Sequence, residues 1–251
     1  PNAVVTMSQS TTAPDGFFHS MKYDCTTASG TVAAGDLVYF SQIFEGLDLL
    51  HIKKGTAQAR ALTVSFWVNT TKTGTYIVSM YDNDNARSCS QAYTVSSSDT
   101  WEYKTVTFPP DTTGAYDNDN AASLYVHWGL VAGTDWTSGT LATAWESNVS
   151  ANQFVGQVDA FDSTDNNFHI TGIQMELGNT ATDFQYELQG DNLERCKRYF
   201  INYAGTKYGA RYSTSAGFVD LEFPRRMRAS PTILSYSAVR TTTGLGYYPA
   251  A

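Results

Sequence analysis

Six short segments in the first 190 residues alternate between apolar and polar side chains, and this period of two residues limits the fold most strongly. Side chains on a β-strand point alternately to the two faces of a sheet, so the pattern predicts strands with one buried face. Clusters of Asn, Asp, Gly and Thr separate the segments and are typical of turns. We therefore predict an all-β fold, an antiparallel jelly-roll β-sandwich, with strands at 37–44, 62–68, 75–81, 102–108, 124–131 and 168–177.

Two of these segments separate their faces clearly. The segment at 62–68 places its aliphatic residues and Phe66 on one side, which leaves Trp67 on an otherwise polar side. The segment at 124–131 directs Trp128 inward, so that Tyr125 and His127 share the opposite face. We expect the inward faces to form the core, from Leu62, Val64, Phe66, Val68, Leu124, Val126, Trp128 and Leu130.

Composition excludes several classes of protein. Aromatic residues make up 14% of the chain and charged residues 16%, which excludes a disordered tail. No run approaches the roughly 18 apolar residues of a membrane span, so we expect no membrane insertion. The net charge of −8 argues against nucleic-acid binding, because phosphate contacts need clustered Lys and Arg. The three cysteines have no close spacing, which predicts reduced, mostly buried thiols in a protein that folds in a cytoplasm.

Charge is divided unevenly along the chain. Residues 1–190 hold 7 basic and 20 acidic residues, giving 7 − 20 = −13, whereas 191–251 hold 9 and 4, giving 9 − 4 = +5. This change of sign predicts two modules with a boundary at 190. The second module should begin with a short helix at 191–200, capped by Asp191 or Asn192. Short strands at 203–212, 216–223 and 232–239 should follow, forming a small β region for oligomerisation or docking.

The order of several short motifs resembles a known family. The motifs are LTVSFWV at 62–68, GTY at 74–76, WEYKTVT at 101–107, DTTG at 111–114, LYV at 124–126, ITGIQMELG at 170–178, ATDF at 181–184 and MRASPT at 227–232. Together they resemble the carbohydrate-binding-module-like jelly-roll region of bacteriophage tail-fibre and virion structural proteins. The resemblance implies a jelly-roll of the glycan-binding type, then a helix and a small C-terminal β region. It also implies a homo-oligomeric virion appendage, most commonly a trimer.

No catalytic signature is present. The chain lacks a Gly-x-Ser-x-Gly elbow, a His-Glu-x-x-His motif and a P-loop. A glycosidase needs only two carboxylates about 5–10 Å apart, and the candidates for such a pair are Glu45, Glu102, Glu146 and Glu176. Carboxylates beside strand ends commonly satisfy backbone donors instead. We predict that the chain is not an enzyme.

Aromatic residues on polar strand faces are the candidates for glycan binding. Sugar rings stack their C–H faces on aromatic rings, while hydroxyl groups bind to amides or His. By alternation, one such face would carry Trp67, Tyr81, Tyr125 and His127, with Gln42 and Gln174 as polar partners. Ordinary surface tyrosines, or a tryptophan beneath a loop, explain the pattern equally well. Trp136 and Trp145 lie in a long loop at 132–150, which is either a recognition loop or a contact between subunits.

The pentapeptide YDNDN occurs at 81–85 and again at 116–120. Its closely spaced oxygens make Asp82, Asp84, Asp117 and Asp119 weak candidates for a structural calcium ion. Asx turns at the ends of the sandwich explain both copies with fewer assumptions. Otherwise we expect no cofactor.

The resemblance implies a phage virion protein of a tail fibre or the capsid surface, assembled in the host cytoplasm. It would bind a host-surface glycan without cleaving it. In a purely architectural alternative, the sandwich binds other virion proteins. A third reading is an accessory module of a glycan-degrading enzyme. The basic residues after 190 would dock on an acidic surface, or simply face solvent.

Overall fold

The computed structural model describes residues 3–203, 210–211, 217–218 and 221–232. The chain divides into two compact units, Pro1–Gln185 and Tyr186–Ala251. We call them the sandwich unit and the C-terminal unit. The sequence analysis placed a boundary at 190, five residues after this division.

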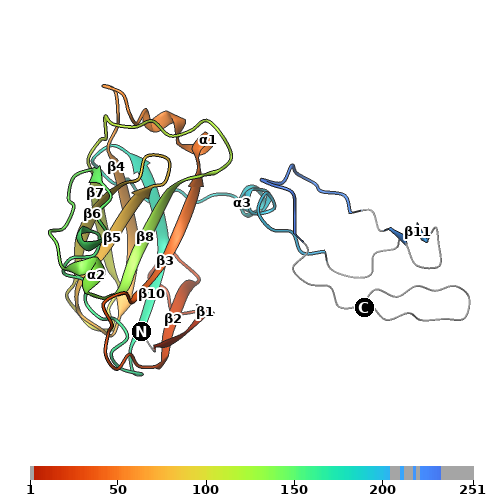
Figure 1. Cartoon of the computed structure of the whole chain (residues 1–251). Helices are drawn as coiled ribbons and strands as arrows, with labels where there is room; N and C mark the ends of the chain where they lie inside the picture. Colours follow the sequence, from red (N-terminus) through yellow and green to blue (C-terminus); the bar gives the residue numbers. More distant parts are fainter. Residues whose placement is uncertain (1–2, 204–209, 212–216, 219–220, 233–251) are drawn as a thin grey trace, which may run out of the picture. The chain divides into compact units, whose positions relative to one another are not determined.

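The sandwich unit consists of two antiparallel five-stranded sheets, as expected for a jelly-roll (Figure 1). Sheet A has the order β1 (Val4–Ser10), β2 (Ser20–Thr27), β10 (Asn167–Leu177), β4 (Leu62–Thr70) and β7 (Glu102–Phe108). Sheet B has the order β3 (Leu37–Glu45), β8 (Ala122–Ala132), β5 (Gly74–Asp82), β6 (Arg87–Val95) and β9 (Glu146–Ser147). All six predicted strands are present, and β1, β2, β6 and β9 were not foreseen.

The core lies between the sheets and follows the predicted alternation. The inward residues of β4 and β8 are all at most 4% exposed. Trp128 stacks on Phe40 of β3 with ring centroids 5.0 Å apart, and its ring also meets Phe66. Each such fully buried side chain contributes about 1.5–3 kcal/mol to folding. This core fixes which side chains point outward from each sheet.

The segment at 133–158 packs on the outward face of sheet B. It contains α2 (Thr134–Thr137) and η2 (Ser150–Asn152) as well as β9. Phe154 lies on Gly129 of β8 so closely that an added Cβ atom would meet its ring at 2.7 Å. The Gln157 side chain accepts a hydrogen bond of 2.8 Å from the backbone N–H of Ile77. This segment therefore covers one half of the face and borders the other half.

A buried ion cluster lies near the end of β5. The short helices α1 (Gly46–Leu49) and η1 (Leu50–Ile52) lead into Lys54, whose ammonium group pairs with Asp82 at 2.6 Å and Asp111 at 3.0 Å. Arg87 also pairs with Asp111, at 2.8 Å. Asp82 is completely buried and Lys54 is 5% exposed. The paired charges make this burial tolerable.

The C-terminal unit contains α3 (Gln189–Cys196) and the strand pair β11 (Ala210–Arg211) and β12 (Gly217–Phe218). The helix is confirmed, but it begins earlier than predicted, because its N-cap is Leu188 rather than Asp191 or Asn192. Leu193, Cys196 and Phe200, the apolar residues of the predicted helix range, are exposed. None of the residues in this unit whose burial is described is buried. The predicted strand at 232–239 lies, apart from Thr232, outside the described residues.

Two of the three cysteines, Cys25 and Cys89, are buried free thiols as predicted, whereas Cys196 is exposed. Among the described residues, no helix combines the length and apolar character needed to cross a membrane.

Candidate functional site

An open groove of about 200 Å³ lies on the outward face of sheet B, beside the covering segment 133–158. Strands β3, β5 and β8 supply one wall, and the segment supplies the other. The groove is lined by Leu37, Tyr39, Tyr81, His127, Trp136, Asn148, Ser150, Gln153 and Phe154.

Aromatic rings form a continuous row across the three strands. Tyr39 of β3 meets His127 of β8 in a T-shaped contact, with ring centroids 4.4 Å apart. His127 stacks on Tyr125 at 5.7 Å, and Tyr125 lies 6.2 Å from Tyr81 of β5. Register explains the row, because Tyr125 is paired with Tyr81 and also with Ile43 of β3. All of these side chains leave the sheet on the side away from the core.

Trp136 completes the groove from the covering segment. Its indole N–H donates to the Gly35 carbonyl oxygen at 3.4 Å, and its own carbonyl oxygen accepts the Phe154 N–H at 3.0 Å. The first contact ties α2 to the turn before β3, and the second ties it to the residue that packs on Gly129. The indole is thereby held beside the strand aromatics.

The groove is electrically neutral. No Lys, Arg, Asp or Glu is among its lining residues. Burial lowers the pKa of His127 to about 4, so its imidazole is uncharged at neutral pH. Its Nδ1 atom is buried and has no hydrogen-bond partner among the described residues. The other polar lining groups are the hydroxyls of Tyr39, Tyr81 and Ser150, the Trp136 indole and the amides of Asn148 and Gln153. The Gln153 amide donates a hydrogen bond to the Asn148 side chain.

The structure brings together Tyr81, Tyr125, His127 and Trp136 of the predicted site residues. It does not place the others with them, so the expectation of a single face is wrong. Trp67 lies on β4 and Gln174 on β10, both in sheet A. Gln174 accepts a hydrogen bond of 2.7 Å from the Gln185 N–H.

Gln42 and Trp145 are also elsewhere. Gln42 is paired with the core residue Val126, so it points to the side of sheet B opposite the aromatic row. Trp145 packs against the core, and its indole N–H donates to the Pro109 carbonyl oxygen at 2.9 Å. Trp145 therefore contributes to the sandwich rather than to the groove.

Tyr39 is the main groove residue that the sequence analysis missed. It lies in the predicted strand at 37–44, where it alternates with Phe40 in the segment LVYF. A β-bulge between Val38 and Tyr39 shifts the register there, and this shift pairs Tyr39 with Gly129. The alternation of Tyr39 with the inward-pointing Phe40 is the sequence signal that could have identified Tyr39 as an outward residue.

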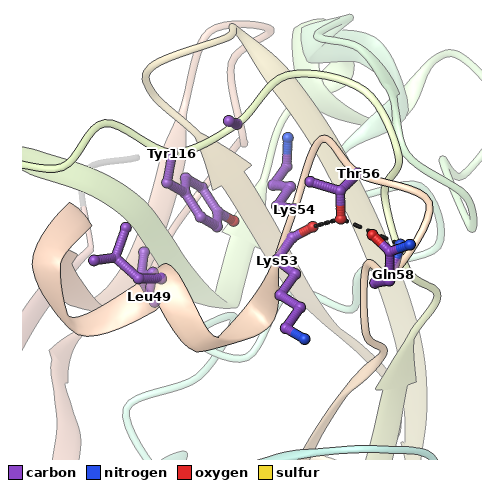
Figure 2. Close-up of a pocket in the computed structure, with 8 residues that line it drawn as sticks. Leu49, Lys53, Lys54, Thr56, Gln58 and Tyr116 are labelled. Carbon is purple, nitrogen blue, oxygen red and sulfur yellow. Dashed lines mark hydrogen bonds between the residues drawn. The ribbon is translucent and has the colours of Figure 1, made fainter.

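A larger hollow of about 410 Å³ lies beside α1 and η1 (Figure 2). Its polar groups do not converge on one point, since the Lys53 side chain points away from Tyr116 (Figure 2). The Lys54 ammonium is engaged by two carboxylates and by the carbonyl oxygens of Thr113 and Gly114. The smaller groove is therefore the better candidate site.

Most of the proposed calcium ligands have protein partners. Asp82 pairs with Lys54 and accepts the N–H groups of Asp84 and Asn85, as in an Asx turn. Asp84 accepts the Asp117 N–H at 2.9 Å, and Asp119 accepts the Ala121 N–H at 2.8 Å. The described residues contain no group of three or more His, Cys, Asp or Glu that fits a metal. A calcium site stays an untested prediction.

Two of the glutamates considered for catalysis, Glu102 and Glu176, do not resemble a general acid, whose pKa should be raised. Burial pushes the pKa of Glu102 upward, but hydrogen bonds from Lys104, Ser97 and Ser96 outweigh it and lower the pKa overall. A hydrogen bond from the Thr182 hydroxyl lowers the pKa of Glu176. Glu146 accepts a hydrogen bond of 2.7 Å from Asn152, and Glu45 is 4% exposed.

Comparison with known proteins gives only distant similarity. No protein-family model matches the chain, and no curated protein does. The enzymatically active domain of tailspike protein 4 of bacteriophage CBA120 is 15% identical over 69% of this chain, with a TM-score of 0.36. The match spans only 18% of that tailspike chain.

Carbohydrate-binding modules are also among the similar structures. A CBM4 structure is 10% identical over 70% of this chain and 77% of its own, with a TM-score of 0.35. The CBM22-1 xylan-binding domain of Paenibacillus barcinonensis Xyn10C is 10% identical over 72% of this chain and 86% of its own, with a TM-score of 0.33. Such low scores carry no argument about what this chain binds, so its function is argued from the groove.

Proposed function

We propose that the sandwich unit binds a glycan, without cleaving it, in the groove on sheet B. The observation that carries the proposal is the convergence of Tyr39, Tyr81, His127 and Trp136 on one open groove beside two amides. Aromatic faces stack on the C–H faces of sugar rings, and the Asn148 amide, which Gln153 holds in place through a hydrogen bond, binds hydroxyl groups.

The neutral lining indicates a neutral sugar. An acidic sugar would place a carboxylate beside uncharged His127, with no cation among the lining residues to pair with it. Burying an unpaired charge is unfavourable. The open shape suits an internal stretch of a polysaccharide rather than a chain end held in a closed pocket.

During infection, this binding would attach a phage virion to the surface of the host cell. The ordered motifs that resemble tail-fibre and virion structural proteins support this role. The C-terminal unit, with exposed Leu188, Leu193, Tyr199 and Phe200, supports assembly into a homo-oligomer, with a trimer as the expected form. Neighbouring virion proteins would be the other partners.

The test is affinity electrophoresis of the full chain in gels that contain neutral dextran, xylan or galactomannan, or acidic alginate, and in gels of host-surface polysaccharide. Retardation by a neutral polymer that persists at high salt would support the proposal. Tyr39→Ala and Trp136→Ala should weaken it clearly. Phe18→Ala, which removes a ring that is 88% exposed outside the groove, is the matched control. Retardation by alginate alone, or unchanged retardation of both groove variants, would refute it.

A purely architectural role is the second candidate, favoured by the absence of buried residues in the described part of the C-terminal unit. Such a protein would assemble normally and bind no glycan. Its groove variants would then impair assembly, which light scattering measures.

A further inference from the structure

The outward face of sheet A carries a second group of aromatic side chains that the groove does not use. Trp67 of β4 is paired with Tyr103 of β7, and their ring centroids lie 5.4 Å apart. Trp101 precedes Tyr103 by two residues, and its ring lies 6.2 Å from that of His169, which points outward from β10. We call Trp67, Trp101 and Tyr103 the aromatic platform.

The platform is accessible in the sandwich unit. Tyr103 is 43% exposed, and the two tryptophans are partly exposed. Large aromatic rings gathered on one sheet face are unusual for a surface that only contacts water. Thr105, two residues beyond Tyr103 on the same face, is exposed and offers a hydroxyl group.

The charged groups that act on His169 beside the platform are one cation, Lys22, and two carboxylates, Asp24 and Asp99. Lys22 and Asp24 of β2 share this face and pair with each other at 2.9 Å. Burial, followed by the Lys22 charge, lowers the pKa of His169, so its imidazole is uncharged at neutral pH. Lys22 therefore has its own counterion, and a neutral occupant suits this face better than an anionic one.

The small area of the platform argues for a small occupant. Its three rings expose on the order of 200 Å² together, given that an aromatic side chain has 150–250 Å² to bury. A stable protein interface needs about 800 Å² from each partner. The area matches the faces of one or two sugar rings instead.

We infer that the aromatic platform is a second glycan site, which stacks the C–H faces of a neutral polysaccharide on Trp67 and Tyr103. The inference shares the ligand class of the proposed function but depends on no groove residue. Because the two sites lie on the outward faces of opposite sheets, one chain binds two separate stretches of polymer. Such bivalency strengthens attachment without a new contact at either site.

Isothermal titration of the full chain tests the inference. The probe is an oligosaccharide cut from whichever of dextran, xylan or galactomannan retards the wild type in gels. We expect two equivalents bound per chain for wild type and Phe18→Ala. Tyr39→Ala and Tyr103→Ala should each leave one, and the double variant none. In gels, Tyr103→Ala should weaken retardation about tenfold through lost avidity.

The failures of the two sites are distinguishable. One equivalent in the wild type, removed by Tyr39→Ala and unaffected by Tyr103→Ala, overturns the platform and keeps the groove. One equivalent removed only by Tyr103→Ala keeps the platform and rejects the groove. If Tyr103→Ala breaks the oligomer and leaves stoichiometry unchanged, the platform is a protein contact and the inference is wrong. Thermal melting of Tyr103→Phe, which keeps the ring, establishes that the site folds.

Discussion

The rings of Tyr39 and His127 meet at an interplanar angle of 77° with centroids 4.4 Å apart, which joins the edge strand β3 to its neighbour β8 on the outward face of sheet B. His127 is partly buried in this row, and burial keeps its imidazole uncharged at neutral pH. A T-shaped pair also holds each ring in one orientation. The groove therefore presents fixed aromatic surfaces before any ligand arrives.

Stability should fall in acid because of His127. Its pKa is lowered by burial from 6.5 to about 4, so between these values the unfolded chain takes up a proton that the folded chain does not. The stability is fully present above pH 6.5 and is lost as pH falls to about 4, by as much as roughly 3 kcal/mol. Urea unfolding at pH 7 and pH 4.5 measures it. His127→Asn should reduce the dependence of stability on pH, whereas His19→Asn should leave it unchanged. The same pH dependence in both variants would contradict this explanation.

Lys54 should be essential for folding, while its neighbour Lys53 should not. Lys54→Met leaves the completely buried Asp82 without its ammonium partner, which should cost about 3–5 kcal/mol. Lys53→Met makes the same chemical change at an exposed side chain and should change stability by less than about 0.5 kcal/mol. Chemical denaturation of the two variants gives the comparison. Similar losses in both would show that the buried cluster is not the cause.

Gly129 should be needed for the close approach of the covering segment. In Gly129→Ala the new methyl group would meet the Phe154 ring and the Gln157 side chain, both at 2.7 Å, so the segment must shift. We expect a loss of about 1–3 kcal/mol and weaker glycan retardation, because Trp136 is tied to Phe154. Gly30→Ala is the control, since its methyl group meets nothing within 4 Å. A fully stable Gly129→Ala chain with normal binding would show that the segment does not shape the groove.

The C-terminal unit should control assembly. Replacing two exposed apolar residues, as in Leu193→Ser with Phe200→Ser, should lower the mass measured by light scattering while the thermal transition of the sandwich remains. The basic residues of this unit predict further dissociation between about 0.1 and 0.5 M salt, where surface charges are screened. Unchanged mass in both experiments would place the subunit contacts elsewhere.

Sequence periodicity predicted the sandwich because each of the six strands buries one face against the core. It missed β1, whose described residues are mainly exposed at the edge of sheet A, so no apolar alternation marks it. It also missed β6, where Ser88 and Ser90 point away from the core yet are completely buried. Their burial is due to a distant segment, which alternation within one strand does not reveal.

The site was predicted only in part, because alternation within one strand does not reveal which distant segments come together. Alternation correctly placed Tyr81, Tyr125 and His127 on outward faces, but it cannot tell one sheet from the other. Trp67 has the same local pattern as Tyr125, and only strand order assigns it to sheet A. The position of Trp136 beside the groove depends on its hydrogen bond to Gly35, about a hundred residues earlier.

The most direct test of the groove is the affinity of Tyr81→Ala for a neutral polysaccharide that the wild type binds, measured by gel retardation with the thermal transition as the check on folding. Tyr81 lines the groove and ends the aromatic row, and its ring lies 6.2 Å from that of Tyr125. We predict binding at least about tenfold weaker, a loss of about 1.4 kcal/mol, with near-normal binding in Tyr81→Phe. Equal affinity of Tyr81→Ala and wild type would contradict a glycan site on this face.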